Sequence, residues 1–185
     1  MTVPRTLNLV RDGKESWVSS LPAPELWSLA YDSIRIENLP AGLHTLPESK
    51  SGKFHLPCVI RVRMDSLADL QMELGNSSGQ RLIFGYSDTG KRYFINRANS
   101  GSTQFHPAFT SLITAPRLKK DKGHREEILV ILDQSSVEFF ADDGLTVMTA
   151  LYFPDETPGH FQVNSSTGIR SVDFTMLRNI WTGNY

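Results

Sequence analysis

The chain has 185 residues, of which 39% are hydrophobic, and its 19 basic residues are balanced by 20 acidic ones. That length fits one ordinary domain, with or without an appendage, and suffices for a core that needs no metal or disulfide. The formal net charge of −1 predicts neither a nucleic-acid partner nor attraction to an acidic membrane. Apolar runs are too short to span a bilayer, and residues 1–9 lack the basic start and apolar stretch of a signal peptide.

Residues 1–31 differ in pattern from the rest of the chain. Residues 6–10 and 16–19 flank a turn at Asp12 and Gly13, which predicts a two-stranded hairpin. Residues 21–29 follow as a proline-containing linker, and a short helical turn is expected near its end. An isolated hairpin is only marginally stable, so we expect this segment to belong to a larger structure. We place a domain boundary between residues 31 and 32.

The remaining residues predict short strands separated by turns. In chain order, the expected strands are 58–64, 70–74, 81–87, 92–96, 127–133, 135–141, 145–153 and 169–176. The strand at 127–133 is apolar almost throughout and rich in β-branched residues, as in a strand covered on both faces. Strands at this spacing, without alternating helices, are typical of an all-β sandwich or barrel.

A hairpin is predicted around the Asp-Asp-Gly turn at 142–144, whose central residues can adopt positive φ. Alternation places Val137 and Phe139 on one buried face and Glu138 on the other, where its carboxylate is either solvated or paired. We therefore expect Phe139→Ala to cost about 3–5 kcal/mol. Asp142→Ala, as a change in a turn, is expected to cost much less.

No residue pattern indicates a metal or catalytic site. None of the histidines lies at metal-ligand spacing from another histidine, and Cys58, the single cysteine, cannot form a paired-cysteine zinc motif. They are His44, His55, His106, His124 and His160. The adjacent carboxylate pairs are Glu126-Glu127, Asp142-Asp143 and Asp155-Glu156. Neighbours on a strand point to opposite faces, so these pairs do not converge as the two carboxyl groups of a glycosidase must.

Aromatic side chains could stack on sugar rings if several shared one exposed face. The residues considered are Trp17, Trp27, Tyr31, Tyr86, Tyr93, Tyr152 and Trp181. Tyrosines also serve as core residues whose hydroxyl end stays polar. Packing is therefore the favoured interpretation, and sugar binding is the alternative.

Residues 132–144, with Val147-Met-Thr149 and Phe153-Pro154, resemble the C-terminal β-sandwich of glycoside hydrolase family 32, the fructan-active invertases, levanases and inulinases. Residues 4–9 resemble the last strand of the family's N-terminal propeller, and residues 21–26 resemble its linker. Residues 93–97 with Ser100-Gly101, and residues 169–181, also agree in order. The resemblance implies an antiparallel two-sheet β-sandwich, jelly-roll or lectin-like, at 32–185. Residues 1–31 would then be a remnant of the propeller's last strands plus the linker.

The family's catalytic motifs are absent from this sequence. Catalysis in the family uses the Asp of Trp-x-Asn-Asp-Pro-Asn, the Asp of Arg-Asp-Pro and the Glu of Glu-Cys, all in the propeller. Here no asparagine precedes an aspartate, Arg11-Asp12 is followed by Gly13, and Cys58 is preceded by Pro57. The resemblance therefore implies an excised or truncated accessory domain with no catalytic residue and no cofactor. Its parent would be secreted, periplasmic or at the cell surface.

Three functional hypotheses follow. The first is a non-catalytic sandwich that supports a fructan-hydrolysing propeller, the second is a carbohydrate-binding module, and the third is an independent glycosidase that uses Glu138. The expected partners are the propeller, a fructan or other oligosaccharide, and a second copy of the chain. Residues 4–31 are expected to form the docking surface, because the segment is too short to bury its own apolar side chains. The candidates are Leu7, Leu9, Trp17, Leu26 and Trp27.

Overall fold

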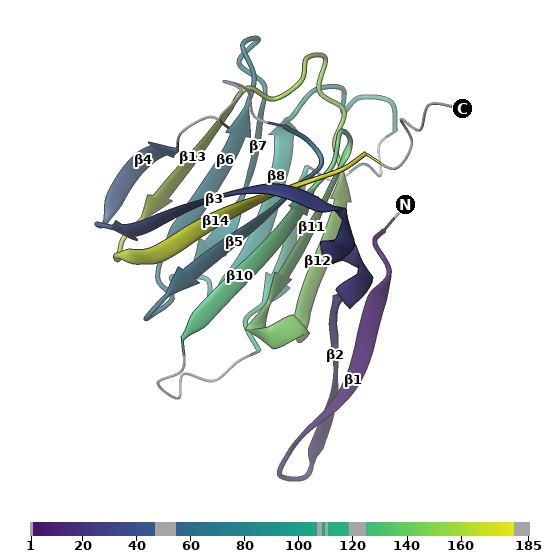
Figure 1. Ribbon diagram of the computed structural model, residues 1–185, viewed down its shortest axis with the longest axis vertical. Helices are drawn as coiled ribbons and strands as arrows, with labels where there is room; N and C mark the ends of the chain where they lie inside the picture. The colour runs from purple at the N-terminus through teal and green to yellow at the C-terminus, as the bar shows by residue number, and fades with distance from the viewer. Residues whose placement is uncertain (1, 47–54, 107–108, 110, 119–124, 180–185) are drawn as a thin grey trace.

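The computed structural model describes residues 2–46, 55–106, 109, 111–118 and 125–179. Two six-stranded antiparallel sheets pack face to face as a sandwich, and a separate hairpin extends from it (Figure 1). The front sheet, nearer the viewer, has the order β12 (Thr146–Leu151), β11 (Ser136–Ala141), β10 (Glu126–Leu132), β5 (Cys58–Met64), β14 (Ile169–Leu177) and β3 (Ala30–Leu39). The back sheet has the order β4 (Gly42–Leu46), β13 (His160–Ser165), β6 (Leu70–Gly75), β7 (Arg81–Ser87), β8 (Arg92–Asn99) and β9 (Leu112–Pro116). The predicted fold class is confirmed.

The main core lies between the two sheets. It is built from every second residue of the strands, those whose side chains point inward. On β11, Val137 and Phe139 are fully buried in this core, as predicted. Across the sandwich, the ring of Tyr93 on β8 lies 5.6 Å from the ring of Phe139. Aromatic rings from both sheets therefore pack against each other in the core, where each ring buries a large apolar area.

A second, smaller cluster covers the outer face of the front sheet. Its buried members are Val59, Leu129, Ile131, Phe140 and Leu177. Val3 and the linker pack against them, including the short 3₁₀ helix η1 (Pro24–Leu29). Strand β10 is thus covered on both faces, which explains its uninterrupted apolar run and confirms the prediction made from it.

The hairpin consists of β1 (Arg5–Asp12) and β2 (Glu15–Pro22) and forms a two-stranded sheet of its own. Its turn contains Gly13, at φ +61°, a conformation that glycine adopts without steric cost. In Figure 1 the hairpin points away from the sandwich, with the linker at its base. Strand β3 begins at Ala30, two residues before the predicted boundary at 32.

Candidate functional site

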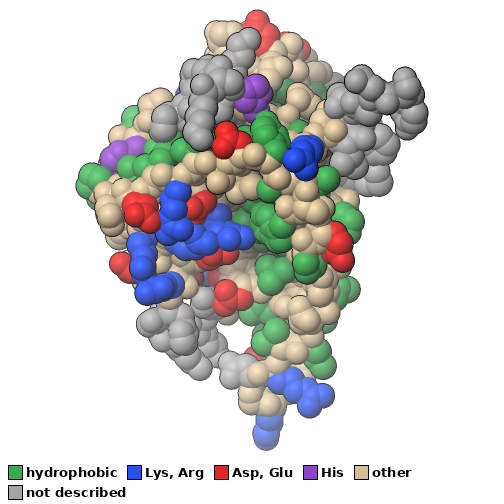
Figure 2. Space-filling view, viewed as in Figure 1, with side chains coloured by type: hydrophobic (Ala, Val, Ile, Leu, Met, Phe, Trp, Pro, Cys, Tyr) green, Lys and Arg blue, Asp and Glu red, His purple; other side chains and the backbone are tan. Residues whose placement is uncertain are grey.

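The exposed apolar side chains of the hairpin form the most prominent surface feature outside the sandwich. Leu7 and Leu9 are 66% and 61% exposed, and Trp17 and Val18 are also exposed. The register pairs Leu9 with Val18 and Val10 with Trp17. Adjacent strand residues point to opposite faces, so both faces of this small sheet carry uncovered apolar side chains. Hydrophobic side chains are visible along this segment in Figure 2.

The structure places the other two docking candidates differently. Leu26 and Trp27 are only partly buried, and both pack against the outer cluster of the front sheet. The guanidinium carbon of Arg61 lies 5.2 Å from the centroid of the Trp27 ring, a cation–π contact. The five candidates therefore do not form one patch. Leu7, Leu9 and Trp17 are exposed on the hairpin, whereas Leu26 and Trp27 attach the linker to the sandwich.

Glu138 anchors the start of the hairpin to the sandwich. Its side chain is 3% exposed and lies on the outer face of the front sheet. One carboxylate oxygen accepts a hydrogen bond from the backbone N–H of Val3 at 2.6 Å, and the other pairs with Arg5 at 2.5 Å. Arg5 also donates to Thr149 at 2.9 Å and lies over the ring of Phe140. Of the two states predicted for Glu138, solvated or paired, the structure shows the paired one.

A glycine contact fixes the other strand of the hairpin. Gly144 has φ +84°, and a Cβ at this position would lie 2.7 Å from the carbonyl oxygen of Ser20 and 2.9 Å from Cγ of Leu21. A side chain here would strain the turn and also push β2 away. The turn of the sandwich is therefore shaped to receive the hairpin.

Asp142 is more than a turn residue. Asp142 and Asp143 both have positive φ, as expected for this turn. The buried carboxylate of Asp142 accepts hydrogen bonds from the Tyr93 hydroxyl at 2.7 Å, the Leu118 N–H at 2.7 Å and the Thr146 hydroxyl at 2.8 Å. Burial, reinforced by this carboxylate, raises the pKa of Tyr93 above its ordinary range. The expectation of a small cost for Asp142→Ala rested on a turn role alone, and the structure contradicts that premise, because the change also removes the acceptor of these three hydrogen bonds.

Charged side chains on the outer face of the front sheet pair with one another. Arg63 contacts Glu127 at 2.9 Å and Asp173 at 2.5 Å, and Arg61 contacts Glu127 at 3.3 Å. Figure 2 shows basic and acidic side chains intermixed over this region. Partly exposed pairs of this kind contribute little to stability, and they leave no large surface of one sign.

The other residues considered for chemistry have structural positions. Tyr86, Tyr93 and Tyr152 are each about 1% exposed, which confirms the packing interpretation for these tyrosines. Cys58 is buried, and burial raises the pKa of its thiol. Among the residues that the structure describes, no three His, Cys, Asp or Glu side chains lie close enough together to hold a metal ion. His124 and Trp181 lie outside the described residues.

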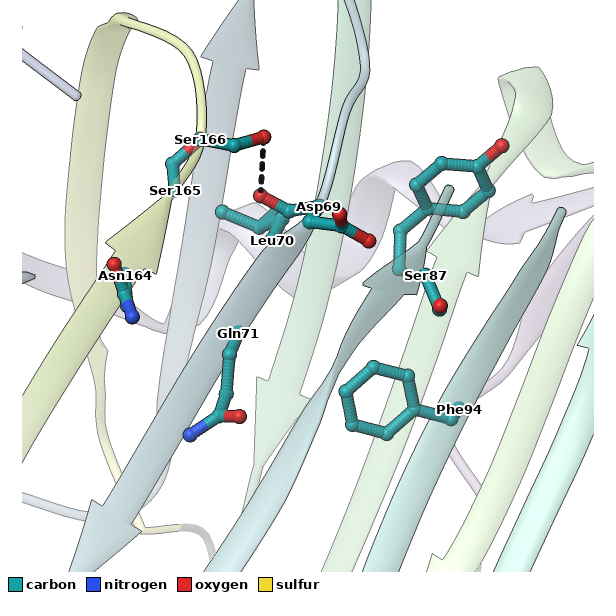
Figure 3. Close-up of a pocket in the computed structure, with 9 residues that line it drawn as sticks. Asp69, Leu70, Gln71, Ser87, Phe94, Asn164, Ser165 and Ser166 are labelled. Carbon is teal, nitrogen blue, oxygen red and sulfur yellow. Dashed lines mark hydrogen bonds between the residues drawn. The ribbon is translucent and has the colours of Figure 1, made fainter. Parts of the chain in front are cut away.

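A hollow of about 410 Å³ on the back sheet was not predicted from the sequence. Its lining includes Gln71, Ser87, Phe94 and Asn164, which come from four different strands (Figure 3). Phe94 lies in the 93–97 stretch that resembles the family, but that stretch does not point to a hollow. Only the register of the sheet brings them together, so no local pattern in the sequence indicates the hollow.

Comparison with known proteins places the chain in a family. A family model described as glycosyl hydrolases family 32 C terminal matches residues 29–180. Levanases from Bacillus sp. (strain L7) and Bacillus subtilis (strain 168) are each 27% identical over 98% and 97% of this chain, and an extracellular exo-inulinase from Aspergillus awamori is 25% identical over 97%. The chain spans only 20%, 27% and 33% of the lengths of these three proteins.

Solved structures share the fold. The exo-inulinase from Aspergillus awamori superposes with a TM-score of 0.78 at 20% identity, covering 97% of this chain and 36% of that one. Fructan 1-exohydrolase IIa from Cichorium intybus superposes with a TM-score of 0.72 at 12% identity, covering 96% of this chain and 41% of that one. In the described residues, no helix has the length and apolar character needed to cross a membrane. The family match shows that the chain belongs to glycosyl hydrolase family 32, whose C-terminal domain it contains at residues 29–180.

Proposed function

We propose that this domain supports the catalytic propeller of a fructan-hydrolysing glycosidase of the levanase, inulinase or invertase type, and that it docks through the β1–β2 hairpin. The observation that carries the proposal is the uncovered apolar surface on both faces of the hairpin. A two-stranded sheet with this surface is poorly stable by itself and gains most from being completed by further strands. The family resemblance names the propeller as the source of those strands.

The base of the hairpin supports the same proposal. The Arg5–Glu138 ion pair holds β1, and the Gly144 contact with Ser20 and Leu21 holds β2. Buried ion pairs fix geometry more reliably than they add stability. The hairpin is thus presented at a defined angle, as a docking element requires, because a rigid element loses less entropy on binding.

The geometry around Glu138 argues against catalysis by the sandwich itself. Both oxygens of Glu138, the carboxylate considered for an independent glycosidase, are occupied by Val3 and Arg5. A general acid or a nucleophile must instead face a substrate. We therefore assign hydrolysis to the propeller. Because relatives are named as extracellular exo-inulinases, we further propose that the whole enzyme acts outside the cell.

Binding to the separately produced propeller of the parent enzyme tests the docking proposal. We expect Leu9→Asp, which places a charge on the exposed hairpin face, to weaken binding by about tenfold or more. Tyr31→Ala is the matched control, since Tyr31 is 52% exposed but lies on β3 rather than the hairpin. Wild-type affinity in Leu9→Asp, or no binding by the wild-type chain, would overturn the proposal.

A further inference from the structure

Four residues form a continuous row across the outer face of the back sheet. Asn164 on β13 pairs with Gln71 on β6, Gln71 pairs with Gly85 on β7, and Gly85 pairs with Phe94 on β8. Residues directly opposite each other in a sheet share a face, so all four lie on the same side. With strands about 4.8 Å apart, the row is roughly 14 Å long. Asn164, Gln71 and Phe94 of this row line the 410 Å³ hollow.

Gly85 stands between Gln71 and Phe94 in the row and places no side chain between them. A Cβ at this position would lie 1.9 Å from the carbonyl oxygen of Leu70, so only glycine fits. Figure 3 shows the Phe94 ring on one side of the hollow and the Gln71 amide on the other, with Asn164 beyond Gln71.

The chemistry of the lining favours a neutral ligand rich in hydroxyl groups. The amides of Gln71 and Asn164 offer donors and acceptors, the Ser87 hydroxyl offers both, and the half-buried Phe94 ring offers an apolar face. Among the described residues, Asp69 is the only charged one in the lining, and its carboxylate accepts a hydrogen bond from the N–H of Asp88 at 2.7 Å. Without a basic group in the lining, an anionic ligand would lack a counter-charge.

From this arrangement we infer that the hollow is a binding subsite for a short neutral oligosaccharide, with one sugar ring stacked on Phe94 and the next ring held by the amides of Gln71 and Asn164. A pocket that combines an apolar platform with a few directed polar groups is the usual design of a small-molecule site. The identification of this oligosaccharide as a fructan rests on the proposed function.

The position of the hollow allows oligosaccharide binding and docking to occur together. The linker and the base of the hairpin pack against the front sheet, whereas the hollow opens on the outer face of the back sheet. The two sheets face each other across the core, so these surfaces lie on opposite sides of the sandwich. A fructan held at the hollow would therefore not compete with docking through the hairpin, whose base lies on the front sheet.

Titration of the ¹⁵N-labelled chain with inulin-type and levan-type oligosaccharides, followed by NMR, tests this subsite. We expect saturable shifts centred on the amides of Gln71, Gly85, Phe94 and Asn164. Phe94→Ala and Gln71→Ala should each weaken binding by about tenfold. Gln71 is exposed, so its variant keeps the fold even if Phe94→Ala does not.

Two controls make the result decisive. Tyr31→Ala, which removes an exposed aromatic ring elsewhere, should bind the oligosaccharide as the wild type does. Leu9→Asp should also bind it normally, which separates this subsite from the docking proposal. The inference is overturned if the wild-type chain shows no saturable shifts, if a glucan oligosaccharide binds but both fructans do not, or if folded Gln71→Ala and Phe94→Ala variants keep full affinity.

Discussion

The carboxylate of Asp142 joins three segments of the chain at one buried point, because its donors come from β8, from residue 118 and from β12. We predict that Asp142→Ala lowers the free energy of unfolding by about 2–4 kcal/mol more than Asp143→Ala. Asp143 is the matched control, since it has nearly the same positive φ but an exposed side chain. Urea denaturation of both variants measures the difference, and equal losses would refute the role of the three hydrogen bonds.

The buried cysteine and tyrosine side chains should make the folded chain less stable at alkaline pH. Burial raises the pKa of Cys58, Tyr93 and Tyr152 above their ordinary values of 9.0, 10.0 and 10.0. Above pH 9 the unfolded chain releases these protons while the folded chain retains them, so the unfolding free energy falls as pH rises. Each group contributes up to about 1.4 kcal/mol per pH unit.

Cys58→Ala isolates the first of these groups. Cys58 is the earliest to ionise in the unfolded chain, so the variant should show a shallower decline in unfolding free energy between about pH 9 and 10. Comparing slopes rather than absolute stabilities removes the cost of the smaller side chain. Identical slopes for variant and wild type would show that the thiol ionises in the folded state.

At the level of elements, burial determined which strands could be predicted. Strands β5, β6, β10 and β11 lie inside their sheets, and their apolar residues identify them from sequence. Three of the four strands that sequence analysis missed, β3, β4 and β9, lie at sheet edges, and their exposed positions interrupt the apolar signal. The fourth, β13, is interior, but Gln162 and Asn164 alternate with its two core residues.

The hairpin should be separable from the sandwich. We predict that deletion of residues 1–20 leaves a cooperative thermal transition, because the main core between the sheets contains none of these residues. Glu138 becomes solvated when Arg5 and Val3 are removed, so no unpaired charge stays buried. Loss of the cooperative transition in the truncated chain would show that the hairpin belongs to the folding unit and that the boundary near residue 31 is misplaced.

On the scale of the whole molecule, the family resemblance predicted the two-sheet sandwich that the structure shows. It did not predict the hollow, because the row from Asn164 to Phe94 depends on the register of four strands, of which β13 is far in sequence from β6, β7 and β8. Nor did it predict that Leu26 and Trp27 pack on the sandwich while Leu7 and Leu9 remain exposed. Such distinctions depend on long-range packing, which single-sequence patterns do not contain.

The purified domain should hydrolyse no fructan. Without the family's carboxylate pair it lacks both the acid and the nucleophile of glycoside hydrolysis. The measurement is fructose release from levan, inulin and sucrose, with the Glu138→Gln variant alongside. Sugar release that disappears in Glu138→Gln would contradict the assignment of catalysis to the propeller.

Hydrogen exchange of the hairpin amides, with and without the separately produced propeller, tests the docking role most directly. In the isolated domain, the amides of β1 and β2 should exchange faster than those of residues 128–140, because local stability follows buried contacts. Addition of the propeller should slow exchange in β1 and β2 and leave residues 128–140 unchanged. Unchanged exchange in the hairpin at saturating propeller would contradict the account.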